Sequence, residues 1–141
     1  MRELRPDVLS ADMSSESESE RLFTVEEANA ALERLRIALE RIREARQVVL
    51  RSGERVKETA SGDGGGAEGE AYWHALRTLR VELEGLAADG IVLRDADSGL
   101  VDFPSEREGR VIQLCWRLGE DRVAFWHEID AGFGNRKPLE P

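Results

Sequence analysis

The sequence predicts an α+β fold in which a two-helix antiparallel hairpin packs on a four-stranded antiparallel meander sheet. Two observations support this prediction. Up to Gly90, apolar residues recur at spacings of three and four, as they do on one face of a helix. After Gly90, short apolar runs alternate with polar turns, which is typical of strands. We expect the helices to cover one face of the sheet.

Length and composition set the domain organisation. The chain has 141 residues and a formal net charge of -9. Residues 1–22 are acidic and contain few large apolar side chains, so burial there cannot offset the entropy cost of ordering the chain. We expect a disordered acidic tail over 1–22 and a single α+β domain over 23–141. The negative charge argues against a nucleic-acid partner, because phosphate binding depends on clustered Lys and Arg.

Cysteine content and hydropathy indicate the compartment. Cys115 is the only cysteine, so an internal disulfide is excluded, and a lone cysteine is typical of a reducing cytoplasm. No run of eighteen apolar residues occurs, and the first residues lack the apolar core of a secretory signal. The expectation is a soluble cytoplasmic protein without a membrane partner.

The first helix is predicted over 24–51. Thr24 and Glu27 have the spacing of a capping box, in which each side chain accepts a hydrogen bond from the backbone amide of the other residue. A stripe with a seven-residue repeat follows. Its members are Val25, Ala28, Leu32, Leu35, Leu39, Ile42 and Val49. This periodicity predicts a long helix with one buried side.

A glycine-rich linker is predicted over 61–69 and a second helix over 70–89. The apolar stripe of this second helix consists of Tyr72, Leu76, Leu79, Leu83 and Leu86. Two such helices joined by a linker fold back most simply as an antiparallel hairpin. Apolar side chains outside the stripes, such as Ile37 and Val48, favour a homodimer formed through the helices.

The sheet is predicted over 91–130, followed by a C-terminal tail over 131–141. Its four strands are Ile91 to Arg94, Leu100 to Phe103, Arg110 to Leu118 and Arg122 to Asp130. Polar segments, including one over 104–109, are predicted to form the turns between these strands.

The last two strands are predicted to form a hairpin with Trp116 opposite Phe125. Strand side chains alternate between faces, so this register places Trp116 and His127 on the apolar face against the helices. Cys115 and Trp126 then lie together on the opposite, polar face. We expect a ligand or partner to bind on that polar face.

The candidate ligand-binding residues come from this polar face and from the C-terminal tail. They are Asp102, Cys115, Trp126, Glu128, Asp130 and Arg136. Within this set Glu128 and Asp130 share a face and are the metal candidates. Arg136 and the glycines around it make a small anion a second candidate ligand. No cofactor is indicated.

Two residues of this region are expected to be structural. His127 points away from Glu128, so we predict a buried histidine that is hydrogen-bonded to backbone or to a carboxylate. Cys115 lacks a clear basic neighbour, so we predict a buried thiol rather than a catalytic thiolate.

Four segments of the chain carry a resemblance to a known family. They are Phe23 to Asn29, Gly99 to Pro104, Leu114 to Glu120, and Phe125 to Phe133 followed by Arg136 and Pro138. Together they resemble a bacterial family catalogued as domain of unknown function 2203, over about 23–139. The resemblance implies a small bacterial cytoplasmic protein and no catalytic roles. The chain departs from the family pattern at Glu33, where a proline is expected, and in its enlarged glycine-rich segment.

No coherent catalytic constellation emerges from these residues. We therefore expect a non-enzymatic binding or protein-interaction module. The alternative is a metal-assisted or small-ligand enzyme that uses the polar face of the C-terminal hairpin.

Overall fold

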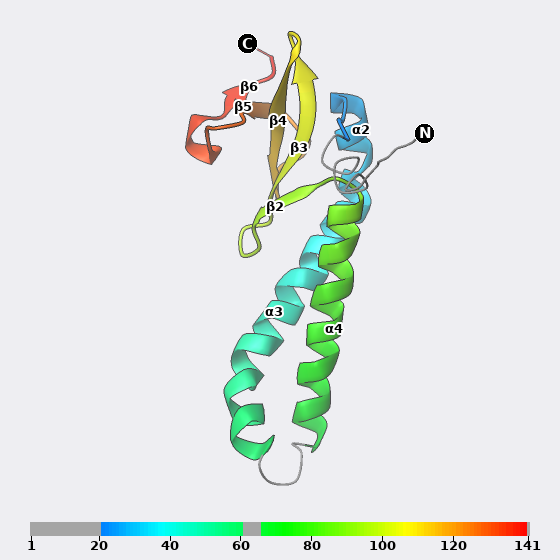
Figure 1. Cartoon of the computed structure of the whole chain (residues 1–141), viewed down its shortest axis with the longest axis vertical. Helices are drawn as coiled ribbons and strands as arrows, with labels where there is room; N and C mark the ends of the chain where they lie inside the picture. The colour runs from blue at the N-terminus through cyan, green and yellow to red at the C-terminus, as the bar shows by residue number, and fades with distance from the viewer. Residues whose placement is uncertain (1–20, 61–65, 141) are drawn as a thin grey trace, which may run out of the picture.

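The computed structural model describes residues 21–60 and 66–140. Within these ranges it has an α+β fold with three α-helices and one five-stranded antiparallel sheet (Figure 1). The elements are α2 (Val25–Ala30), α3 (Leu32–Ala60), α4 (Gly66–Ala88), β2 (Val92–Asp95), β3 (Leu100–Arg107), β4 (Arg110–Arg117), β5 (Phe125–Glu128), the 3-10 helix η1 (Phe133–Asn135) and β6 (Lys137–Pro138). The predicted fold class is confirmed, but the sheet has five strands rather than four.

The start of the domain follows the predicted capping box. The Glu27 amide donates to Thr24 Oγ1 at 3.0 Å, and the Thr24 amide donates to Glu27 Oε1 at 2.9 Å. Residues 1–20 of the tail expected over 1–22 lie outside the described residues. Arg21 already contacts the domain, because its guanidinium donates to the Asp89 carbonyl at 2.7 Å.

The first predicted helix is present as α2 and α3, separated only by Ala31. Its stripe is buried as expected, at Ala28, Leu32, Leu35, Leu39 and Ile42. The helix continues to Ala60 rather than ending at 51. Residues 52–60 contain no proline and a single glycine, so the sequence offers no strong stop there.

The second helix, α4, begins at Gly66 and therefore includes part of the predicted linker over 61–69. The rest of that linker, 61–65, lies outside the described residues. The predicted stripe of α4 was wrong in part, because Leu86 is buried but Leu83 is 41% exposed. In Figure 1, α4 lies alongside α3, and most of the hairpin projects away from the sheet. The helices therefore cover the sheet only near their sheet-proximal ends.

The sheet is a meander with strand order β2-β3-β4-β5-β6. Strand β3 continues to Arg107, into the segment 104–109 that was predicted as a turn. The chain reverses only at Glu108 and Gly109, whose φ angles are 54° and 82°. Pro104 is tolerated in β3 because β2 does not pair with this part of the strand. Its carbonyl instead accepts a hydrogen bond from the Phe23 amide at 2.7 Å. The fifth strand, β6, comes from the predicted C-terminal tail.

Strands β4 and β5 pair one residue out of the predicted register. Leu114 lies opposite Trp126 and Cys115 opposite Phe125, whereas Cys115 was predicted to face Trp126. A one-residue slip reverses the face of every side chain on the strand. Trp126 therefore lies on the core face with Leu114, and His127 lies on the opposite face with Cys115. Both predicted placements were wrong.

The connection between β4 and β5 accounts for this slip. Residues 118–124 form a loop rather than a tight turn, and hydrogen bonds to Trp116 and to the helices help to hold it in place. Trp116 Nε1 donates to the Glu120 carbonyl at 3.1 Å, Arg36 Nη2 donates to the Asp121 carbonyl at 3.1 Å, and the Val123 amide donates to Asn29 Oδ1 at 2.8 Å. The Val123 side chain is thereby buried in the core, and β5 starts only at Phe125.

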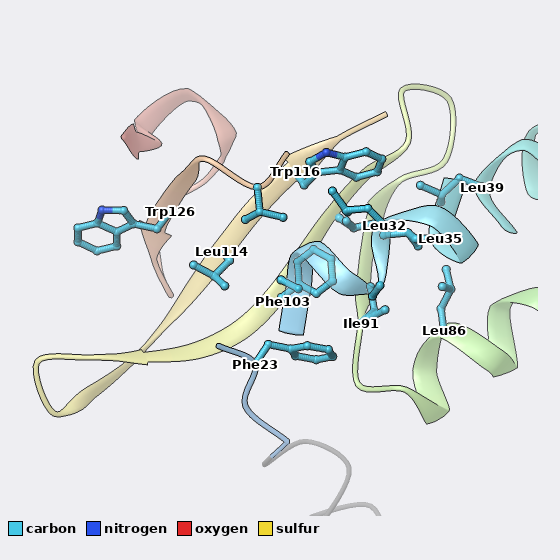
Figure 2. Close-up of a cluster of buried hydrophobic side chains, with 14 of the residues drawn as sticks. Phe23, Leu32, Leu35, Leu39, Leu86, Ile91, Phe103, Leu114, Trp116 and Trp126 are labelled. Carbon is cyan, nitrogen blue, oxygen red and sulfur yellow. The ribbon is translucent and has the colours of Figure 1, made fainter. Parts of the chain in front are cut away.

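The core lies between one face of the sheet and the sheet-proximal ends of the helices (Figure 2). Phe23 packs edge to face on Phe103, with ring centroids 5.1 Å apart, and Trp116 is fully buried beside α3. Trp126 lies at the edge of the cluster, away from the helices (Figure 2). No helix in the described residues combines the length and apolarity needed to cross a bilayer.

Candidate functional site

The sheet face opposite the core carries a buried polar cluster formed by Asp102, Cys115 and His127. Asp102 on β3 pairs with Cys115 on β4, and His127 on β5 pairs with Gln113, two residues before Cys115. Strand alternation therefore brings all three side chains to the same face. One donor atom from each residue lies within 4.8 Å of the other two, and all three residues are buried.

Asp102 is the centre of the hydrogen bonding in this cluster. Its Oδ1 lies 3.1 Å from His127 Nε2, and its Oδ2 accepts a hydrogen bond from Arg94 Nε at 2.7 Å. Arg94 extends from β2 and remains about half exposed. A buried carboxylate is costly unless it is paired, and here both of its oxygens have partners.

The contact of His127 with the Glu128 backbone determines which ring nitrogen carries hydrogen. Nδ1 lies 2.8 Å from the carbonyl oxygen of Glu128. A carbonyl can only accept, so Nδ1 carries hydrogen and donates it. Nε2 is then the ring nitrogen that faces the carboxylate of Asp102.

Cys115 is a free thiol at the floor of the site. Burial raises its pKa to about 11, and this effect outweighs the guanidinium of Arg136, which acts in the opposite direction. The Asp102 carboxylate adds to the rise. The thiol is therefore protonated at neutral pH, as expected for a structural cysteine rather than a catalytic thiolate.

A pocket of about 340 Å³ opens over the cluster. Its walls come from β2, from the start of β3 and from the segment that follows β5. Besides the three cluster residues, the lining consists of Arg94, Leu100, Ile129, Asp130, Ala131, Gly132 and Phe133. The chain after β5 thus folds over the polar face and shapes the access to it.

An ion pair fastens this C-terminal segment. Arg136 donates to both carboxylate oxygens of Glu120 at 3.0 Å, and its guanidinium stacks on Phe125 at 3.9 Å and on Phe133 at 4.5 Å. Burial alone would raise the pKa of Glu120, but the hydrogen bonds from Arg136 and from the Arg117 amide hold that pKa below its ordinary value. Glu120 and Arg136 therefore form a latch over the edge of the sheet.

Comparison with known proteins places the chain in a family. Residues 21–139 match a family described as "Uncharacterized conserved protein (DUF2203)". The chain belongs to the DUF2203 family. No curated protein and no solved structure matches this DUF2203 chain. The cluster residues lie in three of the four segments on which the resemblance rests, one residue in each segment.

Four of the six predicted site residues of this DUF2203 protein lie in or beside the pocket. Asp102 and Cys115 belong to the cluster, and Asp130 lines the same pocket. Arg136 lies next to the site, where its guanidinium donates to Glu120. The guanidinium therefore takes part in a structural ion pair and is not presented to an anion.

The other two predicted residues, Trp126 and Glu128, lie away from the pocket. Trp126 is part of the core cluster, and Glu128 forms an ion pair with Arg110 at 2.6 Å. Glu128 and Asp130 therefore do not form the expected metal pair. The residue that sequence reasoning left out of the site is His127. Its hydrogen bond to a carboxylate was predicted correctly, but the wrong register placed it on the other face.

Proposed function

We propose that this DUF2203 protein is a non-enzymatic binding protein whose ligand occupies the pocket over Asp102, Cys115 and His127. One observation carries the proposal: both ring nitrogens of His127 already have hydrogen-bond partners, Asp102 and the Glu128 carbonyl. A nucleophilic cysteine needs a neighbouring base to take its proton, and His127 does not serve Cys115 in this way. A pocket with a few converging polar groups supports ligand binding instead.

The setting that we propose for this function is the bacterial cytoplasm. Cys115 is reduced and buried, and a protein that keeps a free thiol fits a reducing compartment. The proposed ligand is therefore one that occurs in that compartment.

A binding screen tests the proposal. Amide NMR shifts of the full-length protein would be followed during titration with small carboxylates, phosphates, amines and divalent cations. We expect at least one compound to shift amides at 94, at 115 and over 127–133. The variant Ala131→Phe, which places a ring on the pocket wall, should abolish these shifts.

The matched control is Ala71→Phe, which lies in a groove between α3 and α4 and should bind as the wild type does. Two outcomes contradict the proposal. One is a screen without any binder. The other is binding that survives Ala131→Phe but not Ala71→Phe, since this would move the site to the helices.

The exposed apolar surface of the hairpin favours a second role in self-association. Ile37, Trp73 and Val81 are 52%, 59% and 53% exposed, and an apolar groove of about 360 Å³ runs between α3 and α4 next to Ile37. Exposed apolar surface of this kind supports a homodimer formed through the helices.

Analytical ultracentrifugation tests the dimer. We expect a dimer for the wild type, a monomer for the double variant Ile37→Glu with Val81→Glu, and a dimer for the control Gln47→Glu on the exposed side of α3. A wild type that sediments as a monomer at high concentration would exclude this role and leave the proposed pocket unaffected.

A further inference from the structure

We infer that the ligand of the pocket is a divalent transition-metal ion of the zinc class, bound by Asp102, Cys115 and His127. This inference rests on the proposed function, because it names the ligand of the same site. The three residues supply one carboxylate oxygen, one thiolate sulfur and one imidazole nitrogen, which are the donor types that proteins use for zinc.

The ring of His127 is oriented as in a metal ligand. Nδ1 lies against the Glu128 carbonyl, so Nε2 is the ring nitrogen directed at Asp102 Oδ1, 3.1 Å away. A metal ion bound to both atoms would use the ring orientation that the backbone already selects.

The groups around the three ligands are arranged as an outer shell. Arg94 holds Asp102 Oδ2, so Oδ1 remains directed at the cluster. The Glu128 carbonyl holds the ring of His127 in the same way. Such outer hydrogen bonds orient the ligands of metal sites. Gln113, which pairs with His127, also has a buried side-chain oxygen without a partner among the described residues.

The distances are close to those of a metal site. Bonds of about 2.0 to 2.3 Å place the ligand atoms of a tetrahedral zinc roughly 3.5 Å apart. The ligand atoms of Asp102 and His127 are already 3.1 Å apart, and the whole set lies within 4.8 Å. Binding therefore requires an inward movement of roughly 1 Å by the side chains, while the strands stay in place.

Charge and access also favour a divalent cation. A metal-bound Cys115 is a thiolate, and together with the carboxylates of Asp102 and Asp130 it balances a divalent ion and the guanidinium of Arg94. Three protein ligands leave a fourth coordination position. The pocket lies over the cluster and is lined by Asp130, so water or a second small ligand can reach that position.

Cobalt(II) provides the spectroscopic test, because it replaces zinc and gives a charge-transfer band when a thiolate binds it. We expect the full-length protein to bind one equivalent of Co²⁺, to show this band, and to release the Co²⁺ when Zn²⁺ is added. Cys115→Ser should abolish the band. Arg94→Gln, which removes an outer hydrogen bond from Asp102, should weaken binding by about 10- to 100-fold.

The control variant is Glu128→Gln, which changes a carboxylate on the other sheet face and should leave the Co²⁺ spectrum and affinity unchanged. Circular dichroism of each variant checks that it folds. If Cys115→Ser does not fold, the wild type loaded with ¹¹³Cd²⁺ still decides the matter. Its NMR shift should then indicate one sulfur ligand, and an all-oxygen shift would overturn the inference.

Metal binding and ligand binding at this pocket can fail independently. If Co²⁺, Zn²⁺ and Cd²⁺ do not bind while an organic compound binds in a manner blocked by Ala131→Phe, the metal is excluded and the binding function stands. If Co²⁺ binds without the thiolate band and Glu128→Gln abolishes this binding, the metal lies elsewhere and the inference is wrong.

Discussion

Asp102 Oδ1 lies 3.1 Å from His127 Nε2, although 25 positions separate the two residues in the chain. The contact joins β3 to β5 across β4, on the sheet face that the helices do not cover. It therefore links β3 and β5 through side chains, in addition to the backbone ladder that each strand forms with β4. The same two residues define the candidate ligand site.

Asp102→Asn tests the energetic importance of this contact. The variant removes the charge that Arg94 and His127 face, and breaking a buried charged pair typically costs about 3 to 5 kcal/mol. We expect a loss near the lower end of that range, because Arg94 is partly exposed to water. Urea denaturation of Asp102→Asn and of the control Asp130→Asn, which should change stability by less than about 0.5 kcal/mol, measures the difference. Equal stabilities would mean that the contacts of Asp102 with Arg94 and His127 do not stabilise the fold.

The two faces of the sheet are tested by a second pair of variants. Trp116→Ala empties a fully buried site in the core and should cost about 3 to 5 kcal/mol. Glu128→Ala removes a partly exposed partner of Arg110 and should cost no more than about 1 kcal/mol. Thermal unfolding monitored by circular dichroism gives both values, and the reverse ranking would contradict the assignment of faces.

The sequence was sufficient to predict the features of this fold that depend on local signals. The Thr24 and Glu27 capping box, the buried stripe of the first helix and the meander of strands each follow from residues close together in the chain. Asp102 and Cys115 were both among the candidate site residues, and the pairing of β3 with β4 brings them to one face.

The register of β5 could not be predicted in the same way. It depends on contacts between the loop over 118–124 and the first two helices, such as the hydrogen bond from Val123 to Asn29, which is 94 positions away. Taken alone, the sequence of this segment predicts a tight turn, and that turn shifts the register of β5 against β4 by one residue. That single residue transfers His127 from the expected core to the candidate site, and Trp126 in the opposite direction.

Gly99→Ala tests the turn between β2 and β3. Gly99 has a φ of 72°, and a Cβ added there would lie 2.7 Å from the Leu118 Cβ. We expect a loss of about 2 to 4 kcal/mol, from strain in the left-handed region together with the steric clash. The control is Gly109→Ala, with a φ of 82° and open space around the added methyl, which should cost only about 1 kcal/mol. Equal losses in denaturant melts would show that the contact with Leu118 relaxes freely.

The latch between Glu120 and Arg136 should give the protein a defined acid response. The pKa of Glu120 is below its ordinary value of 4.5 in the folded chain. Its contribution to stability is therefore complete above about pH 4.5 and is lost as the pH falls through the folded value. Glu120→Gln should lose stability at pH 7 and should show a flatter decline in acid, measured as the denaturation midpoint at several pH values. An exposed control, Glu106→Gln, should retain the wild-type decline.

Metal binding should become tighter as the pH rises. The pKa of the Cys115 thiol is raised to about 11, so an ion that binds the thiolate displaces a proton throughout the neutral range. The Kd for Co²⁺ should fall about tenfold per pH unit between roughly pH 6 and 8, because one proton is released for each ion bound. A Kd that does not change with pH would mean that the thiol is not a ligand.

The projecting helical hairpin has a consequence for how such a molecule can vary. Arg46 of α3 pairs with Asp97 in the turn between β2 and β3. The far part of α3 projects away from the sheet together with α4 (Figure 1). Among the described residues, no helix side chain lines the pocket over Asp102. Matched insertions of whole turns in both helices would therefore move the far end outward without disturbing the sheet. The length of the hairpin can therefore change without altering the described lining of the pocket.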